Sequence, residues 1–119
     1  MNRSLILTNG LLVRPDAKTA HGLIRGTERF NIAGVIDSEE TAGKDAGELL
    51  DGTHRNIPVF RSLDDALTSL GRVNYLVLGV ATVGGRLPGN MLDVVIRAKE
   101  AGISIVNVTS PHKFRPLKT

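Results

Sequence analysis

The feature that most constrains the fold is a regular alternation of short apolar runs with longer amphipathic stretches. Five runs have the length and composition of buried strands. The stretches between them place apolar residues three and four apart, as one face of a helix does. Strands that alternate with helices form a parallel sheet with right-handed crossovers. We therefore predict an α/β fold: a doubly wound parallel sheet of about five strands in the order 3-2-1-4-5.

Several residues predict where these elements begin and end. Asp16 is a plausible N-cap of the first helix and Gly26 lies near its end, whereas Ser62 and Gly71 bound a later helix. Pro58 marks its strand as short or at an edge. The predicted strands are Leu5–Leu7, Asn31–Ile36, Ile57–Phe60, Tyr75–Val80 and Ile103–Val108. The predicted helices are Ala17–Arg29, Asp45–Leu50, Leu63–Leu70 and Met91–Ala101.

Length and charge predict one domain followed by a basic tail. The 119 residues suffice for a single core, which we assign to residues 1–110. The net charge of +3 equals the three basic residues of segment 111–119, namely Lys113, Arg115 and Lys118, so the domain itself is neutral. We expect this tail to be flexible. A neutral domain with no tryptophan and few other aromatic residues argues against a nucleic-acid partner.

Composition excludes several other classes. The absence of cysteine rules out disulfides, thiolate metal sites and a thiol nucleophile, and it is compatible with the reducing cytoplasm, where we expect the protein. No apolar run reaches the roughly 18–20 residues of a membrane span, and the N-terminus lacks a signal-peptide core. His21, His54 and His112 are dispersed and no nucleophile motif is present, so we predict neither a metal site nor a catalytic residue.

The predicted topology places a ligand crevice beyond the carboxyl ends of the strands, between the first and fourth. The glycine fingerprint G-x-G-x-x-G is missing after the first strand, and a longer loop takes its place. The first turn of the next helix can still hold an anion, although Asp16 at that end would oppose it and a solvent-facing turn is the alternative. The predicted residues of this wall are Thr8, Asn9, Gly10, Lys18, Thr19 and His21.

Two further segments border the same crevice. Asp37 follows the second strand, where an acidic side chain can bind ribose hydroxyls; the alternative is that it caps the next turn with Ser38. Gly84 and Gly85 permit a nest of amides, and Arg86 offers a guanidinium for phosphate or carboxylate. The alternative for this loop is a plain crossover connection.

Seven segments of the chain together carry a resemblance to a known family. They are Ile6–Gly10, Ala17–Arg25, Val35–Asp37, Ile57–Phe60, Tyr75–Val80, Gly84–Pro88 and Ala101–Asn107, of which the Ala-Lys-Thr-Ala-His-Gly run at 17–22 is the most specific. The family that they resemble is bacterial and archaeal and is catalogued as a domain of unknown function. That family couples a Rossmann-like N-terminal domain to a C-terminal P-loop domain, and it includes the DgcN-type N-acetyltransferases linked to D-glutamate catabolism. The resemblance covers roughly residues 4–107 and implies a Rossmann-like fold.

The chain departs from the family pattern after Asn107. It reads Val108-Thr109-Ser110-Pro111-His112 where members continue toward the P-loop domain, so we expect that domain to be missing. We therefore predict a nucleotide- or anion-binding or assembly module that is not catalytic by itself. Its expected ligand is a nucleotide, an acyl-CoA or another small anion, and its expected assembly is a homo-oligomer. Two alternatives stay open: a part of an N-acetyltransferase-like enzyme of D-glutamate metabolism that needs a P-loop partner, and a purely structural self-association module.

Overall fold

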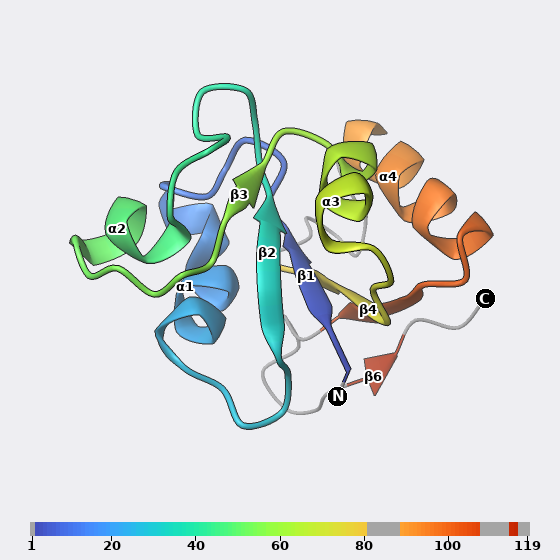
Figure 1. The fold of residues 1–119 in the computed structure, drawn as a ribbon, viewed down its shortest axis with the longest axis horizontal. Coiled ribbons are helices and arrows are strands. Elements are labelled where there is room, and N and C mark those ends of the chain that lie inside the picture. The colour runs from blue at the N-terminus through green and yellow to red at the C-terminus, as the bar shows by residue number, and fades with distance from the viewer. Residues whose placement is uncertain (1, 81–88, 108–114, 117–119) are drawn as a thin grey trace.

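A mostly parallel sheet forms the centre of the computed structural model, which describes residues 2–80, 89–107 and 115–116. Six strands lie in the order β3-β2-β1-β4-β5-β6 (Figure 1). The first five run parallel, and β6 pairs antiparallel with β5. The order 3-2-1-4-5 predicted from the alternating pattern is confirmed. The strands are β1 (Ser4–Leu7), β2 (Ile32–Ile36), β3 (Val59–Phe60), β4 (Tyr75–Leu78), β5 (Ser104–Asn107) and β6 (Arg115–Pro116).

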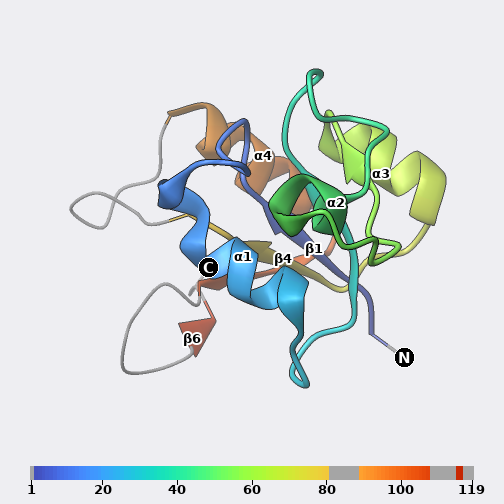
Figure 2. The same ribbon diagram turned by 90° about the vertical axis from the view of Figure 1, so that its left-hand side faces the viewer.

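Helices cover both faces of this sheet. Figures 1 and 2 show α1 and α2 on one face and α3 and α4 on the other, as right-handed crossovers on either side of β1 require. The helical elements are the 3₁₀ turn η1 (Pro15–Ala17), α1 (Lys18–Arg25), α2 (Ala46–Asp51), α3 (Leu63–Leu70) and α4 (Gly89–Glu100). No helix of the described ranges is long and apolar enough to cross a membrane.

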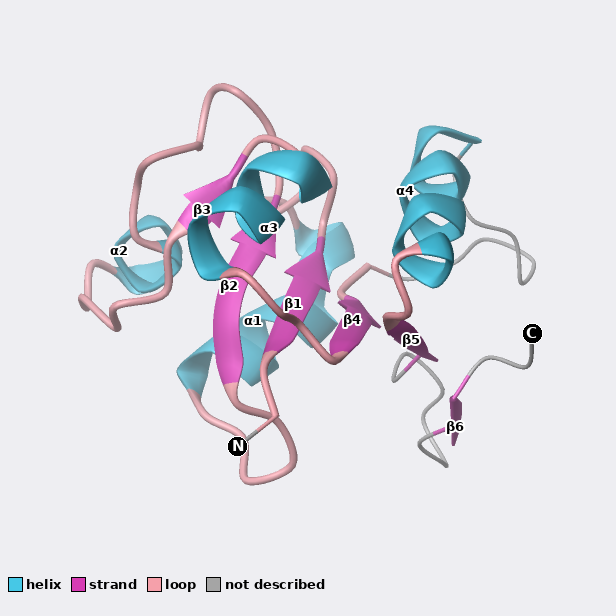
Figure 3. Ribbon diagram, turned by 45° about the vertical axis from the view of Figure 1, so that its right-hand side comes forward, coloured by secondary structure: helices cyan, strands magenta, loops and turns pink. Residues whose placement is uncertain are grey.

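The core lies around β1 and β4, the two strands at the middle of the sheet (Figure 3). All four residues of β1 and the segment Leu76–Leu78 are buried. Strands covered on both faces need continuous apolar sequence, which explains why Tyr75–Val80 is the most apolar run of the chain. Full burial of one Leu, Ile or Val side chain stabilises the fold by about 1.5–3 kcal/mol.

Most predicted element boundaries lie within two residues of the observed ones, but the N-cap and the end of the first helix differ from the prediction. Ser62 caps α3 by accepting a hydrogen bond from the backbone N–H of Asp65. Asp16 was predicted as the N-cap of the first helix, and this is wrong: Ala17 occupies that position. Pro15 begins a 3₁₀ turn that incorporates Asp16 before α1 starts. The helix also ends at Arg25, earlier than predicted, because Gly26 leaves the helical conformation.

The edges of the sheet are short strands. β3 has two residues and follows Pro58, in agreement with the short or edge position that this proline predicts. β6 lies within segment 111–119 and forms the other edge. The division into a domain at 1–110 and a flexible tail stays a prediction.

Candidate functional site

The carboxyl edge of the sheet holds the loop that connects β1 to α1. β1 lies between β2 and β4, so this loop emerges at the point where the strand order reverses. The backbone N–H groups of Thr8 and Asn9 both donate to the carbonyl of Ile36, at 3.0 and 3.1 Å. Asn9 and Gly10 follow with positive φ angles of 49° and 96°, which suit Asn and Gly.

The carboxylate of Asp37 holds this loop in place. Its Oδ1 atom accepts hydrogen bonds from the hydroxyl of Thr8 at 2.5 Å and from the backbone N–H groups of Gly10 and Leu12 at 2.8 and 3.1 Å. Its Oδ2 atom accepts a hydrogen bond from the hydroxyl of Thr41 at 2.7 Å. Because Asp37 is only 4% exposed, these four donors replace the water that its charge would otherwise require.

Asp37 has two predicted roles, binding of a ribose hydroxyl and capping of the next turn, and its contacts bear on both. The bond from Thr41 connects Asp37 to the following turn, as the capping interpretation expects. A carboxylate has about four lone-pair sites, and three of the four accepted bonds fall on Oδ1. A ribose hydroxyl would therefore approach through Oδ2. Ribose binding stays a prediction.

His21 holds the far end of the same loop. Its Nε2 atom donates to the carbonyl of Leu12 at 2.5 Å, because a carbonyl oxygen only accepts. The structure thus brings Thr8, Gly10, His21 and Asp37, four of the predicted site residues, into one hydrogen-bonded unit. The sequence predicts His21 on the wall of the crevice, but no motif signals its contact with Leu12.

The amides of this loop are engaged within the protein. Gly10 and Leu12 donate to Asp37, and Leu11 donates to the carbonyl of Thr8 at 3.0 Å. A ligand beside this loop would therefore be held by groups other than these three amides. The predicted candidates are Lys18, which is exposed, and Thr19, which is half-buried, both in the first turn of α1.

The start of α1 is held against the end of β4. The backbone N–H of Ala20 donates to the carbonyl of Gly79 at 3.1 Å. A Cβ atom at Gly79 would lie 2.5 Å from Cγ2 of Ile6 and 2.9 Å from Cβ of Ala20, so only glycine permits this approach without a shift. Lys18 and Thr19 are thereby placed beside the switch point. The predicted Gly84, Gly85 and Arg86 lie outside the described residues.

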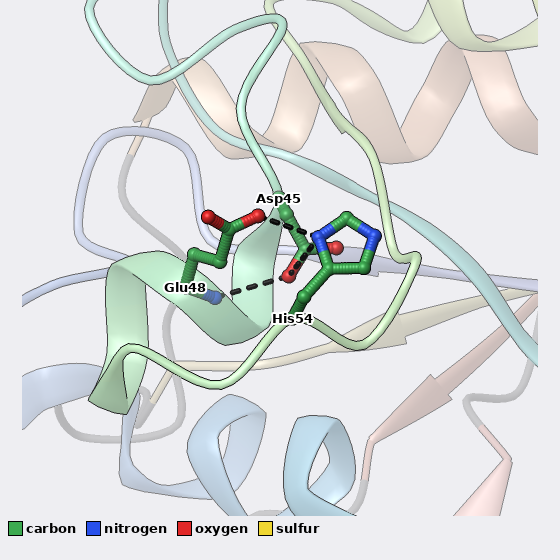
Figure 4. Close-up of side chains that lie close together, drawn as sticks. All are labelled: Asp45, Glu48 and His54. Atoms are coloured by element: carbon green, nitrogen blue, oxygen red, sulfur yellow. Dashed lines mark hydrogen bonds and ion pairs between the residues drawn. The ribbon is translucent and has the colours of Figure 1, made fainter.

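A second polar cluster surrounds the start of α2 (Figure 4). Asp45 is the N-cap: its Oδ2 accepts from the backbone N–H groups of Glu48 and Arg55 at 3.0 Å each, and its Oδ1 accepts from Ile57 at 2.7 Å. Nδ1 of His54 lies 2.5 Å from Oε2 of Glu48 and 3.8 Å from Oδ2 of Asp45. Sequence reasoning found no acidic partner for His54, because only the turn after α2 brings His54 back to Glu48.

The ionisation of this cluster follows its contacts. Burial opposes the charged form of Asp45, but the hydrogen bonds from Arg55, Ile57 and Glu48 outweigh it and lower the pKa of that carboxyl. The hydrogen bond with Glu48, aided by the negative charge of Asp45, raises the pKa of His54. The carboxylates of Glu48 and Asp45 therefore favour the protonated form of the His54 imidazole.

A cavity of about 420 Å³ lies at the opposite, amino edge of the sheet. Phe30 and Tyr75 meet there edge to face, with ring centroids 6.5 Å apart. Ligands of doubly wound folds bind at the carboxyl edge, so this cavity does not coincide with the predicted crevice. Its lining residues are Asn2, Ser4, Arg29, Phe30, Asn31, Tyr75, Ser104 and Val106.

Comparisons with known proteins agree with this fold. Residues 39–114, more than half of the chain, match the family described as a domain of unknown function (DUF1611_N), Rossmann-like domain. The chain is also similar to the crystal structure of a DUF1611 family protein from Anabaena variabilis, with 32% identity and a TM-score of 0.75. This match covers 89% of the present chain but only 29% of that protein's chain. No curated protein matches. The chain belongs to the DUF1611_N family of Rossmann-like domains.

Proposed function

We propose that this domain is a binding module that holds an anionic small molecule, a nucleotide or an acyl-CoA, at the carboxyl edge of its sheet and is not catalytic by itself. The observation that carries the proposal is the locked β1–α1 loop. Asp37 and His21 fix it at the point where the strand order reverses, which is where open α/β sheets bind ligands.

Each group has a role in this proposal. The ammonium of Lys18 and the hydroxyl of Thr19 contact the phosphate or carboxylate, aided by the positive end of the α1 dipole. Asp37 accepts a ribose hydroxyl through Oδ2, in place of Thr41. Gly84, Gly85 and Arg86 are proposed from the sequence alone to complete the crevice.

A thermal-shift screen tests this function. The panel is NAD(H), NADP(H), ATP, acetyl-CoA and acidic amino acids. A ligand present at 100 times its Kd stabilises the folded state by about 2.7 kcal/mol, which raises the Tm by several degrees. Lys18→Ala should abolish the shift. The matched control is Lys99→Ala. It removes the same charge from the last turn of α4, at the amino edge of the sheet and away from the proposed site. A cooperative melt with no shift from any ligand would contradict the proposal.

A second candidate function is assembly, which the surface of α4 favours. Leu92 and Ile96 lie one helical turn apart and are 49% and 46% exposed. We propose that a second copy of the chain packs on this pair. Light scattering should then report an oligomer at micromolar concentration, and Ile96→Asp should convert it to a monomer. A wild-type monomer would exclude this candidate.

The solved relative favours a third arrangement, because its chain is far longer than the segment that this chain matches. We propose that a P-loop domain supplies the groups an N-acetyltransferase-like activity on D-glutamate would need. The chain alone should then show no acetyl transfer, and activity should appear only when a P-loop partner of the family is added. Absence of activity in that mixture would count against it.

A further inference from the structure

We propose that Asp45, Glu48 and His54 form a binding site for one divalent transition-metal ion, with Zn²⁺ as the best match. The site shares no residue with the proposed anion site and does not depend on it. One imidazole nitrogen and two carboxylate oxygens are supplied by a segment of ten residues, and these ligand atoms all lie within 4.8 Å of one another.

The side chains converge on a common point. In Figure 4, Nδ1 of His54 faces both carboxylates, and dashed lines join it to one oxygen of Glu48 and one oxygen of Asp45. Ligand bonds of about 2.0–2.2 Å in a tetrahedral Zn²⁺ site place ligand atoms roughly 3.3–3.5 Å apart. The 3.8 Å between Nδ1 of His54 and Oδ2 of Asp45 is close to that value. The 2.5 Å between His54 and Glu48 must widen by about 1 Å, which two exposed side chains can accommodate.

Asp45 supplies the rigid part of the site. Its side chain is only 5% exposed, and backbone N–H groups on both sides of the α2 turn fix its orientation. Glu48 and His54 are 54% and 64% exposed, so water can fill the remaining coordination position. The site thus combines one fixed carboxylate (Asp45), one adjustable carboxylate (Glu48) and one imidazole. This set of ligands suits Zn²⁺ better than Mg²⁺ or Ca²⁺, which prefer oxygen ligands alone.

Charge balance also favours a dication. Asp45 and Glu48 together carry a charge of −2, which one Zn²⁺ neutralises. Two cations adjoin the cluster in the chain, Lys44 and Arg55, and Arg55 is already bound through two hydrogen bonds to Asp51, at 2.7 and 3.0 Å. When the metal binds, Nδ1 of His54 gives up its proton to solvent and its lone pair forms the bond to the ion. The metal thus replaces the proton that His54 and Glu48 share.

Calorimetric titration of the full, untagged, chelator-treated chain with ZnCl₂ tests the site. We expect one Zn²⁺ per chain and a binding enthalpy that changes with the ionisation enthalpy of the buffer, because a proton is released. His54→Gln and Glu48→Gln should each weaken binding by about tenfold or more, since even indirect metal contacts are worth that much. Both residues are exposed, so the variants should fold.

A matched substitution keeps the test specific. Glu40→Gln removes an exposed acid outside the cluster and should leave the affinity unchanged. Co²⁺ bound at the same site should give the visible absorption of four- or five-coordinate cobalt, which is lost in His54→Gln. Absence of saturable binding, or equal binding by wild type and His54→Gln, would overturn the proposal.

Discussion

Asp37 is the residue on which the β1–α1 loop depends most. One buried carboxylate accepts three hydrogen bonds from that loop and a fourth from Thr41. Buried donors that lose their acceptor cost more free energy than an average hydrogen bond contributes, because they were desolvated on folding. The loop geometry at the proposed site is therefore tied to a single side chain.

Replacing Asp37 tests this dependence. Asp37→Ala leaves Thr8, Gly10 and Leu12 without their acceptor and should lower the free energy of unfolding by about 3 kcal/mol. Asp37→Asn should cost clearly less, because its amide oxygen can still accept from the loop while its NH₂ group donates to Thr41. Urea denaturation gives both values, and equal losses would show that the acceptor role of Oδ1 is not what matters.

Asp51 provides a residue-scale test of pH dependence. Its bidentate hydrogen bonds with Arg55, together with the backbone N–H of Thr53, lower the pKa of Asp51 from 3.8 to about 2. A depressed pKa in the folded state contributes stability above pH 3.8, and this contribution is lost as the pH falls toward about 2. The Tm difference between wild type and Asp51→Asn should therefore be constant at neutral pH, shrink below pH 3.8 and vanish below about pH 2. A difference that persists there would contradict the pairing.

At the scale of elements, tight packing of α1 on the sheet positions the proposed site. Gly79 directly follows β4, and the absence of a side chain lets the first turn of α1 approach Ile6 and the carbonyl of Gly79. Gly22, by contrast, lies within α1 where a Cβ atom would meet nothing within 4 Å. Two glycines of the same region therefore have opposite requirements.

Alanine substitutions separate these two glycines. Gly79→Ala overpacks the contact with Ile6 and Ala20 and should destabilise the domain by about 1–3 kcal/mol. Gly22→Ala should stabilise it by about 0.5–1 kcal/mol, since alanine is the better helix former. Chemical denaturation of both variants measures the contrast, and a neutral Gly79→Ala would show that α1 can move away from the sheet at no cost.

Element-scale patterns also explain how much the sequence could predict. Alternating strands and helices led to the correct strand order, because buried parallel strands and amphipathic helices have local periodicities. Helix α3 was predicted almost to the residue by Ser62 and Gly71. The N-cap at Asp16 was wrong because Pro15 and Asp16 form a separate 3₁₀ turn, a competition between two helical starts that local capping signals do not resolve.

The contacts within the candidate sites lay beyond such patterns. Asp37 and Gly10 are 27 residues apart, and His54 reaches Glu48 only through the turn that closes α2. These pairings depend on strand register and loop geometry, which the type of residue alone does not encode. The residue types at the carboxyl edge could be predicted from topology, whereas the partners of Asp37 and His21 could not.

At the scale of the whole molecule, the domain presents two different ends. The carboxyl edge carries a loop locked by hydrogen bonds beside Lys18 and Thr19, and the amino edge carries the cavity lined by Phe30 and Tyr75. The chain spans 29% of the chain of the solved relative that it matches. Of these two ends, we propose that the carboxyl edge holds the small-molecule site.

Amide chemical shifts test that claim most directly. A ¹⁵N-labelled chain is titrated with the ligand that gives the largest thermal shift, or with acetyl-CoA and ATP in turn. We predict saturable shifts at Thr8–Gly10, Lys18 and Thr19, which Lys18→Ala abolishes. Shifts confined to Phe30, Tyr75 and their neighbours at the amino edge, or no shifts with any ligand, would contradict a small-molecule site at the carboxyl edge.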